Sequence, residues 1–333
     1  MKITDPRVAV TLLTALGFAL VNMAWLPRSN LVIDPGLWML AAKVSAVLVM
    51  TAFATRLIYY RLSKDDSTIA RFIKRTALSL DIARRTVTSL ALLTVSSAIF
   101  TYLATASSRP LLDAELAALD KVLGFDWRSF HALVNGPLAS TLLIWSYHFL
   151  GPQLSLILLL HIAWADEGKA AEINAMIAVS SVFVASGMAI WPAAGAYAYY
   201  LAEPGNFSAA AGMWHYEQLV SLRSGQPFVF SIEKSEGLTT FPSFHTALGI
   251  MLTYSVREWR LLLVAIGTVN ALMIIGTLPE GGHHLVDVIA GAVIGVISIV
   301  IVRWLVRQVP DMMTKPLISD SIPSFSPNRN GDD

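Results

Sequence analysis

The sequence predicts an all-α, polytopic membrane protein with about eight transmembrane helices, and two observations carry this prediction. Of the 333 residues, 55% are hydrophobic and only 14% are charged, whereas a soluble domain carries about 25% charged residues. The hydrophobic residues also gather into long runs, and a helix that spans a bilayer needs about 20 predominantly apolar residues. The chain therefore lacks the polar surface of a soluble protein and has the segments of a membrane protein.

Eight apolar segments are predicted to span the membrane. In chain order they are 8–26, 37–55, 87–106, 138–164, 173–199, 243–256, 261–277 and 284–305. The first has a basic start but continues apolar for too long to be a removed signal peptide, so we expect a retained anchor. Gly151-Pro152 divides the fourth segment, so we expect a kink there; two short helices in its place would invert everything downstream. The sixth segment is short and spans only if the chain around Pro242 enters below the membrane surface.

The distribution of basic residues predicts the orientation of these spans. With the amino terminus in the cytoplasm, most Lys and Arg residues fall in cytoplasmic segments, as the positive-inside rule requires. Lys43 lies within the second span, and the outer segments carry only Arg28, Arg109, Lys121, Arg128, Arg223 and Lys234. We therefore expect both termini in the cytoplasm and the functional face outside; the family resemblance described below implies a bacterial inner membrane, with that face toward the periplasm.

Three connections between the spans have recognisable patterns. The basic loop 56–85 interleaves apolar and basic residues, so it is expected to form a helix on the membrane surface or to serve as a solvated orientation signal. Segment 111–123 has leucines at helical spacing, which predicts a helix lying flat on the outer interface. The long connection 201–240 is predicted to act as a lid or binding loop. The tail after residue 306 is polar, so we expect it to be disordered.

Two histidine motifs lie near the same end of the predicted hairpin, one at the start of the sixth segment and one at the start of the eighth. The first is Phe241-Pro242-Ser243-Phe244-His245, and the second is His283-His284-Leu285-Val286-Asp287. Because two consecutive spans form a hairpin, His245 and His283 are expected to return to the same face, which the basic residues place outside. Asp287 follows His283 by one helical turn, so its carboxylate can orient the imidazole. Ser243 precedes a helix amino terminus, where free N–H groups favour a phosphate.

This pattern predicts phosphoryl transfer, with His283 attacking phosphorus and His245 protonating the leaving oxygen. Two alternatives are a metal site built from His283, His284 and Asp287 with Glu280 nearby, and histidines that are only structural. Adjacent histidines diverge on a helix, which weakens the metal alternative, so neither a metal nor another cofactor is expected. The chain has no cysteine, which excludes disulfides, thiolate metal sites and cysteine nucleophiles. His148 lies within the fourth span, where a hydrogen-bonded structural role or a functional role remains open.

Both motifs resemble signatures of the type 2 phosphatidic acid phosphatase superfamily, and most closely its branch of inositol phosphorylceramide synthases and related lipid phosphotransferases. Segment 112–127 is also similar to a segment of bacterial members of that branch. The resemblance covers residues 86–306 and implies a six-helix core, a phosphohistidine intermediate, no metal, and a site on the non-cytoplasmic face. We therefore expect three parts: residues 1–85 with two amino-terminal helices and a basic loop, a catalytic membrane domain at 86–306, and a disordered cytoplasmic tail at 307–333.

The sequence departs from the phosphatase branch at two cationic positions. Arg109-Pro110 matches the first phosphatase signature, but Tyr102 stands at its Lys position, and Gly276-Thr277 replaces the Ser-Arg pair of the third signature. The loss of two phosphate-binding cations favours transfer over broad phosphatase activity. Besides the catalytic His245, His283 and Asp287, the residues expected to bind the phosphate or substrate are Ser243, Arg109, Thr277 and His284.

The leading hypothesis is a membrane lipid phosphotransferase that moves a phosphorylated headgroup of the inositol-phosphate type. Its expected partners are a phospholipid donor, a lipid or polyol acceptor and the bilayer, and the net charge of +1 gives no reason to expect a nucleic acid. Hydrolysis of a lipid phosphate or diphosphate is the alternative within the same chemistry. A transporter or non-catalytic membrane protein with the same fold is the alternative from another class.

Overall fold

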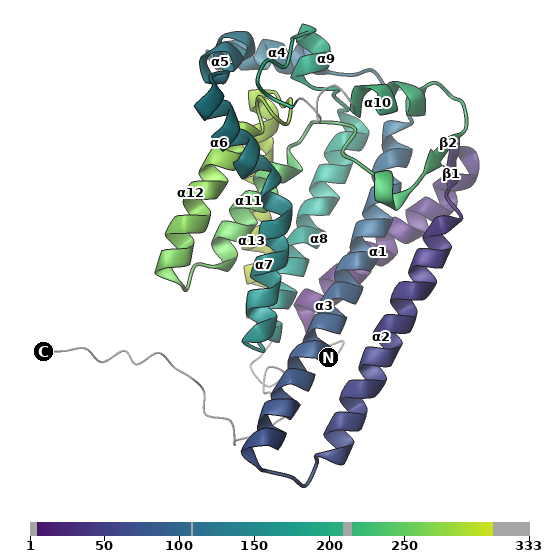
Figure 1. Ribbon diagram of the computed structural model, residues 1–333. Helices are drawn as coiled ribbons and strands as arrows, with labels where there is room; N and C mark the ends of the chain where they lie inside the picture. The colour runs from purple at the N-terminus through teal and green to yellow at the C-terminus, as the bar shows by residue number, and fades with distance from the viewer. Residues whose placement is uncertain (1–4, 108, 209–214, 309–333) are drawn as a thin grey trace, which may run out of the picture.

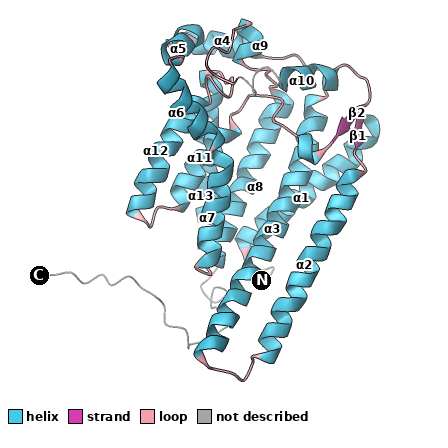
Figure 2. Cartoon of the chain, in the orientation of Figure 1, coloured by secondary structure: helices cyan, strands magenta, loops and turns pink. Residues whose placement is uncertain are grey.

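The computed structural model is a bundle of helices with one loop-rich end (Figures 1 and 2). It describes residues 5–107, 109–208 and 215–308. The long helices are α1 (Pro6–Trp25), α2 (Gly36–Arg61), α3 (Thr68–Thr105), α6 (Pro137–His148), α7 (Leu150–Ala163), α8 (Glu167–Ile190), α11 (Phe244–Ser255), α12 (Arg260–Gly276) and α13 (Leu285–Arg307). The shorter elements are η1 (Leu26–Arg28), β1 (Leu31–Ile33), α4 (Asp113–Val122), α5 (Trp127–Val134), α9 (Ala196–Tyr200), α10 (His215–Arg223), β2 (Phe228–Phe230) and η3 (Ile232–Lys234).

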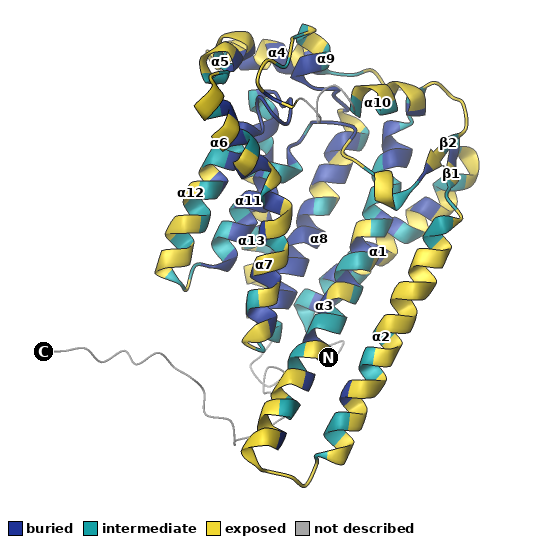
Figure 3. Cartoon of the chain, in the orientation of Figure 1, coloured by how far each residue is buried: buried dark blue, intermediate teal, exposed yellow. Residues whose placement is uncertain are grey.

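Helix α8 forms the centre of the bundle, where α1, α3, α7, α11 and α13 pack around it. Its most apolar stretch is 72% buried, whereas the corresponding stretches of α1, α2, α3 and α13 are at most 33% buried. Figure 3 shows this contrast, because α8 is largely buried while α2 is exposed along most of its length. A helix that is apolar all round belongs either inside a large core or in lipid. The sequence of α8 therefore suits the core, and that of α2 suits a position at the lipid-facing edge.

All eight predicted spans contain helix, and the all-α membrane fold is confirmed. Within the described part of the chain, five helices are long and apolar enough to cross a membrane, or six if the bent pair α6 and α7 counts as one span. The pair is bent by 45° between His148 and Leu150, close to the expected kink, and it runs as one column along the bundle (Figure 1). Helices α11 and α12 have 12 and 17 residues, so α11 covers only about 18 Å of a hydrocarbon core about 30 Å thick.

The loop between the second and third spans differs from the prediction of a separate surface helix. Helix α2 continues to Arg61, and α3 begins at Thr68 and runs unbroken for 38 residues to Thr105. The side chain of Ser67 caps its first turn by accepting a hydrogen bond from the Ala70 N–H, and no Gly or Pro interrupts the sequence after it. Residues 68–85 are therefore helical, as predicted, but they form the first part of the helix that contains the third span. The expected domain boundary between residues 85 and 86 falls inside this helix, and most of the expected tail lies outside the described residues.

The loop-rich end carries the short elements α4, α5, α9 and α10 and a two-stranded parallel sheet. Strand β1 follows α1, and β2 lies in the long connection before α11, so the sheet joins the amino-terminal hairpin to that connection. The predicted interfacial helix is present as α4, and its exposed face carries Leu119 and Leu123. Its buried face carries Asp113, Leu116 and Asp120. Two acidic residues of this helix therefore face the protein rather than solvent.

Candidate active site

The two histidine motifs meet where α11 and α13 begin. The N–H of Ser243, the residue that caps α11, donates a hydrogen bond of 3.0 Å to the backbone carbonyl of Asp287 in the first turn of α13. This bond joins the motifs directly although 44 residues separate them. A Cβ at Gly187, in the last turn of α8, would overlap the ring of Pro242. The site therefore lies close to the loop-rich end of α8.

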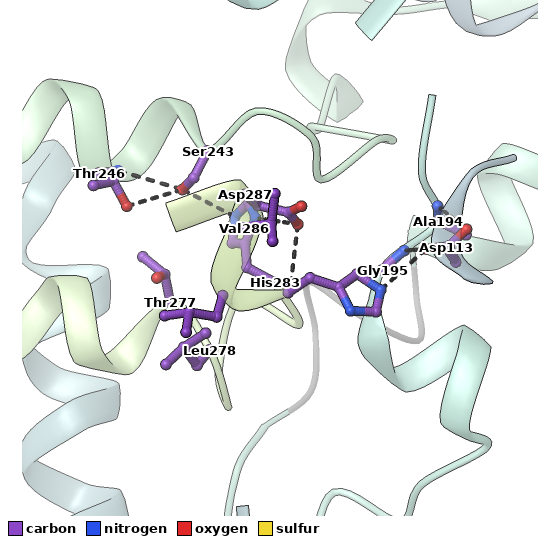
Figure 4. A network of polar contacts seen from close by, with 12 residues as sticks. Asp113, Ala194, Gly195, Ser243, Thr246, Thr277, Leu278, His283, Val286 and Asp287 are labelled. Atoms are coloured by element: carbon purple, nitrogen blue, oxygen red, sulfur yellow. Dashed lines mark hydrogen bonds and ion pairs between the residues drawn. The ribbon is translucent and has the colours of Figure 1, made fainter. Parts of the chain in front are cut away.

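His283 lies in a line of polar contacts between Asp287 and Ser243 (Figure 4). Its Nδ1 is 3.2 Å from Asp287 Oδ2, and its Nε2 is 3.3 Å from Ser243 Oγ. The same carboxylate oxygen accepts the His284 backbone N–H at 3.0 Å, which completes a capping box at the start of α13. With a proton on Nδ1 toward Asp287, Nε2 holds a lone pair and can act as a base or a nucleophile.

His245 stands in the first turn of α11 and is held by an aromatic neighbour. Its ring stacks on that of Tyr147 from α6, with ring centroids 4.6 Å apart. Gly281 brings the two histidine neighbourhoods together, since a Cβ at this position would lie 3.0 Å from both Tyr147 Cε2 and His283 Cδ2. A side chain there would crowd both rings. The stacking partner Tyr147 was not anticipated, because nothing in the fourth segment marks one aromatic residue among several.

His245 and His283 both line one cavity of about 430 Å³. The polar lining that the long connection contributes comprises His215, Ser235, Glu236, Thr239 and Thr240. Thr239 and Thr240 are buried, and their hydroxyl oxygens have no hydrogen-bond partner among the described residues. Buried hydroxyl groups are normally paired, and both of these threonines line the cavity. Their only sequence signal is their position directly before the first motif.

The charge of the cavity lining agrees with the sequence, in which two phosphate-binding cations of the phosphatase signatures are replaced. None of the described residues that line it is a Lys or an Arg. A phosphate there would be held by neutral donors, by the amino terminus of α11 and by any protonated histidine.

Thr277 and Arg109, which are expected to bind the phosphate, lie outside the lining. Thr277 replaces the missing arginine; its hydroxyl donates to Ile274 O at 2.6 Å, and its carbonyl accepts the His283 N–H at 3.2 Å. Arg109 is exposed.

His284 faces away from the cavity and is fully buried between two aspartates of α4. Its ring nitrogens lie 3.5 Å from Asp113 Oδ1 and 3.5 Å from Asp120 Oδ2, distances that fit ion pairs better than short hydrogen bonds. Burial lowers the pKa of His284, but the attraction of the two carboxylates outweighs it and raises the pKa to about 9. His284 is therefore an imidazolium at neutral pH that ties α4 to the start of α13.

The same aspartates also hold backbone N–H groups near the site. Asp120 accepts from Leu285 and Val286 in the first turn of α13, both at 3.0 Å. Asp113 accepts from Ala194 at 2.9 Å and from Gly195 at 2.7 Å. Their seven-residue spacing puts them on one face of α4, which is the sequence signal that could have found them. Their partners could not be found this way, because they lie far along the chain.

Glu280 forms a second polar cluster just before the second histidine motif. Its carboxylate accepts from the Ser208 N–H at 3.0 Å and from the Ser208 hydroxyl, and it lies 2.7 Å from His148 Nε2. Glu280 is only 1% exposed, whereas the His148 side chain is 55% exposed. His148, whose role the sequence left open, is thus paired with Glu280, which lies just before the second motif. This places the end of α6 and the long connection against the same loop.

The alternative metal site finds no ligand set here. Within the described ranges, no three His, Asp or Glu side chains are grouped so that they could hold a metal ion. The physical reason is the divergence of the adjacent histidines, since His283 faces the cavity and His284 faces α4. Glu280 pairs with His148 and Ser208 instead.

Comparison with known proteins gives one match. The sequence profile described as the PAP2 superfamily matches residues 114–301, more than half of the chain. This range contains both histidine motifs, all of α4 after Asp113, and the residues that surround the motifs from α6, α8, α11 and α13. Neither the curated proteins nor the solved structures contain a match.

Proposed function

Because the chain belongs to the PAP2 superfamily, whose members are generally phosphatases or phosphotransferases, we propose that it is a lipid phosphotransferase. It moves a phosphorylated headgroup, of the inositol-phosphate type, from a phospholipid donor to a lipid or polyol acceptor. One observation carries this proposal. The carboxylate of Asp287 contacts Nδ1 of His283, and His283 and His245 line the same cavity. The reaction takes place on the outer face of the membrane, with both termini in the cytoplasm.

In the first half-reaction, His283 Nε2 attacks the phosphorus of the donor. A nitrogen–phosphorus bond forms, and the bond from phosphorus to the diacylglycerol oxygen breaks. His245, which takes up a proton when the anionic phosphate binds beside it, gives that proton to the diacylglycerol oxygen. Asp287 keeps the Nδ1 proton in place and stabilises the positive charge that develops on the ring. The α11 amino terminus and Ser243 contribute donors to the phosphate oxygens. The product of this step is a phosphohistidine that carries the headgroup.

In the second half-reaction, an acceptor hydroxyl attacks the same phosphorus and passes its proton to His245. The nitrogen–phosphorus bond breaks, which returns both histidines to their starting protonation states. Two features favour an alcohol over water as the acceptor. The lining of the cavity has no Lys or Arg among its described residues, and it carries the Glu236 carboxylate and the free hydroxyls of Thr239 and Thr240. Such groups pair well with the hydroxyls of a polyol.

The test uses purified protein in mixed micelles with a phospholipid labelled in its headgroup phosphate. We expect labelled product to form only when a lipid or polyol acceptor is added, and His283→Ala to form none. Release of labelled headgroup phosphate at the same rate without acceptor would instead assign hydrolysis. Full turnover by His283→Ala would remove the catalytic assignment, and no turnover by the wild-type chain with any donor would favour the non-catalytic alternative.

The nucleophile can be identified separately from the acceptor. Ser243 Oγ lies 3.3 Å from His283 Nε2, so a serine activated by His283 is the competing arrangement. A phosphohistidine is labile in acid and stable in base, whereas a phosphoserine is stable in acid. We expect the label trapped on the protein after rapid quenching to be lost in acid and to be absent from His283→Ala. Acid-stable label that disappears in Ser243→Ala would assign the serine instead.

A further inference from the structure

The catalytic cavity continues away from the histidines as a groove between α3 and α8. Its lining on these two helices comprises Leu93, Thr94, Ser97, Ala98, Thr101, Tyr102, Thr105, Ile177, Ser181, Val184, Ala185 and Met188. Thr105 and Met188 lie near the loop-rich ends of their helices, and Leu93 and Ile177 lie deepest. At a rise of 1.5 Å per residue, the groove extends about 18 Å along α3 and about 16 Å along α8. This depth is close to that of one bilayer leaflet, about 15 Å.

The chemistry of the walls of this groove favours an apolar ligand over a polar one. Ile177, Val184 and Met188 on α8 are apolar and buried. On α3 the hydroxyl of Ser97 donates to Thr94 O at 3.2 Å, and that of Thr101 donates to Ala98 O at 2.8 Å. The hydroxyl hydrogens of Ser97 and Thr101 are therefore already used in bonds to the backbone of α3. No Asp, Glu, Lys or Arg of the described chain lines this part of the cavity.

The groove is also accessible from the side of the bundle. Thr94 is exposed, and Ser97, Thr101 and Ser181 are half-buried. Since the surrounding faces of α3 and α8 are apolar and belong to helices that can cross a membrane, the opening faces lipid. A headgroup alone would occupy only the polar end near Thr239 and Thr240. The remaining length of the cavity fits an extended hydrocarbon chain.

We propose that the α3–α8 groove, defined by the twelve residues above, binds one hydrocarbon chain of a substrate lipid and selects it by length. This inference rests on the proposed function, because the headgroup of that lipid must reach His283. A chain that leaves the bilayer for the groove exchanges one apolar environment for another, so it gains little hydrophobic free energy. The groove therefore acts through shape. Leu93 and Ile177 end it, and a longer chain would have to bend or protrude.

Two graded substitutions on α3 test this inference. Thr101→Phe places a ring near the headgroup end of the groove, and Thr94→Phe places one near its deep end. In an assay over donors and acceptors of increasing chain length, we expect Thr101→Phe to lower kcat/KM about tenfold for all but the shortest chains. Thr94→Phe should lower it only for the longest chains. Lengthening the donor chain and the acceptor chain separately shows which substrate occupies the groove.

A matched pair on α8 separates groove effects from general damage. Ser181 lines the groove, whereas its neighbour Val182 is 43% exposed and does not. Ser181→Phe should narrow the chain-length range and Val182→Phe should leave it unchanged. Equal chain-length profiles for the wild type, both α3 variants and Ser181→Phe would overturn the groove assignment while leaving the transferase intact. Parallel losses in Ser181→Phe and Val182→Phe would also overturn it. If the wild type turns over no lipid, the proposed function fails instead.

Discussion

Gly291 of α13 packs directly against the backbone carbonyl of Ser243, so a methyl group at Gly291 would overlap that oxygen. The contact lies one helical turn beyond Asp287 and beside the cap of α11. It sets the separation of the two helices that carry His245 and His283. The geometry of the candidate site therefore depends on the absence of a side chain at this position.

Substituting Gly291→Ala should inactivate the enzyme more than it unfolds it. The methyl group must push α13 from α11, and a displacement near 1 Å at a catalytic group can cost about 100-fold in rate. Phosphotransfer by the purified variant measures this. Gly267→Ala is the matched control, since a Cβ there would meet only Thr253 Cγ2, at 3.6 Å, and Ala favours helix over Gly. Equal activity of the two variants would contradict the packing argument.

Asp287→Asn should retain the fold but lose most of the activity. The amide can still accept the His284 N–H, but it no longer stabilises the Nδ1 proton and the positive charge on His283. Loss of the equivalent carboxylate in a nucleophile triad costs roughly 10⁴-fold in kcat. Single-turnover labelling of the protein should slow by a similar factor, whereas substrate binding should change little. A variant that labels at the wild-type rate would remove Asp287 from the mechanism.

Stability should fall as the pH rises through about 9, because His284 loses its charge there. Its pKa is raised from 6.5 to about 9 by Asp113 and Asp120 against the effect of burial. A raised pKa contributes stability that is fully present below about pH 6.5 and is lost as the pH passes the folded-state value. The contribution is on the order of 3 kcal/mol. Thermal unfolding in detergent between pH 6 and 10 measures it.

The His284→Gln variant provides the control for this pH dependence. It should be less stable than the wild type at neutral pH, because two buried carboxylates lose their cation. Its stability should also change less between pH 6.5 and 9 than that of the wild type. Identical pH profiles for the two proteins would mean that another group causes the wild-type transition.

Glu280→Gln should be more damaging than His148→Ala, although the two residues form one pair. Glu280 is buried and has a second partner in Ser208, so its loss weakens several charge-assisted hydrogen bonds, each worth about 1.5–3 kcal/mol. The His148 side chain is 55% exposed, and exposed ion pairs contribute at most about 1 kcal/mol. The melting temperature and the KM of the two variants test whether Glu280→Gln is the more damaging change. The reverse order would show that His148 acts beyond this pair.

Arg109→Ala should keep its activity within about twofold of the wild type, as expected for an exposed side chain away from special contacts. The side chain of Arg109 does not line the cavity, and its backbone carbonyl accepts a hydrogen bond from Arg223. Measured kcat and KM for the donor phospholipid provide the check. A rise in KM by tenfold or more would restore the phosphate-binding role that the Arg-Pro pair suggested.

The sequence by itself determined the helical membrane fold of this protein, and it predicted that the two histidine motifs come together. These features depend on local or short-range rules: apolar run length, the return of a helical hairpin to one face, and the i, i+4 spacing of His283 and Asp287. It did not reveal that α3 is one unbroken helix, because the basic residues of its first half suggested a membrane surface. The absence of Gly and Pro there was the better indicator.

Only the tertiary structure decided which polar residues serve the site. His284 adjoins His283, the proposed nucleophile, yet it faces α4, because Asp113 and Asp120 lie there. Asp120 is 165 residues from its partner Leu285, and Glu280 is 132 residues from His148. Helical spacing predicts which residues share a face, but not which element covers that face. That choice depends on the packing of distant helices, which also creates the groove between α3 and α8.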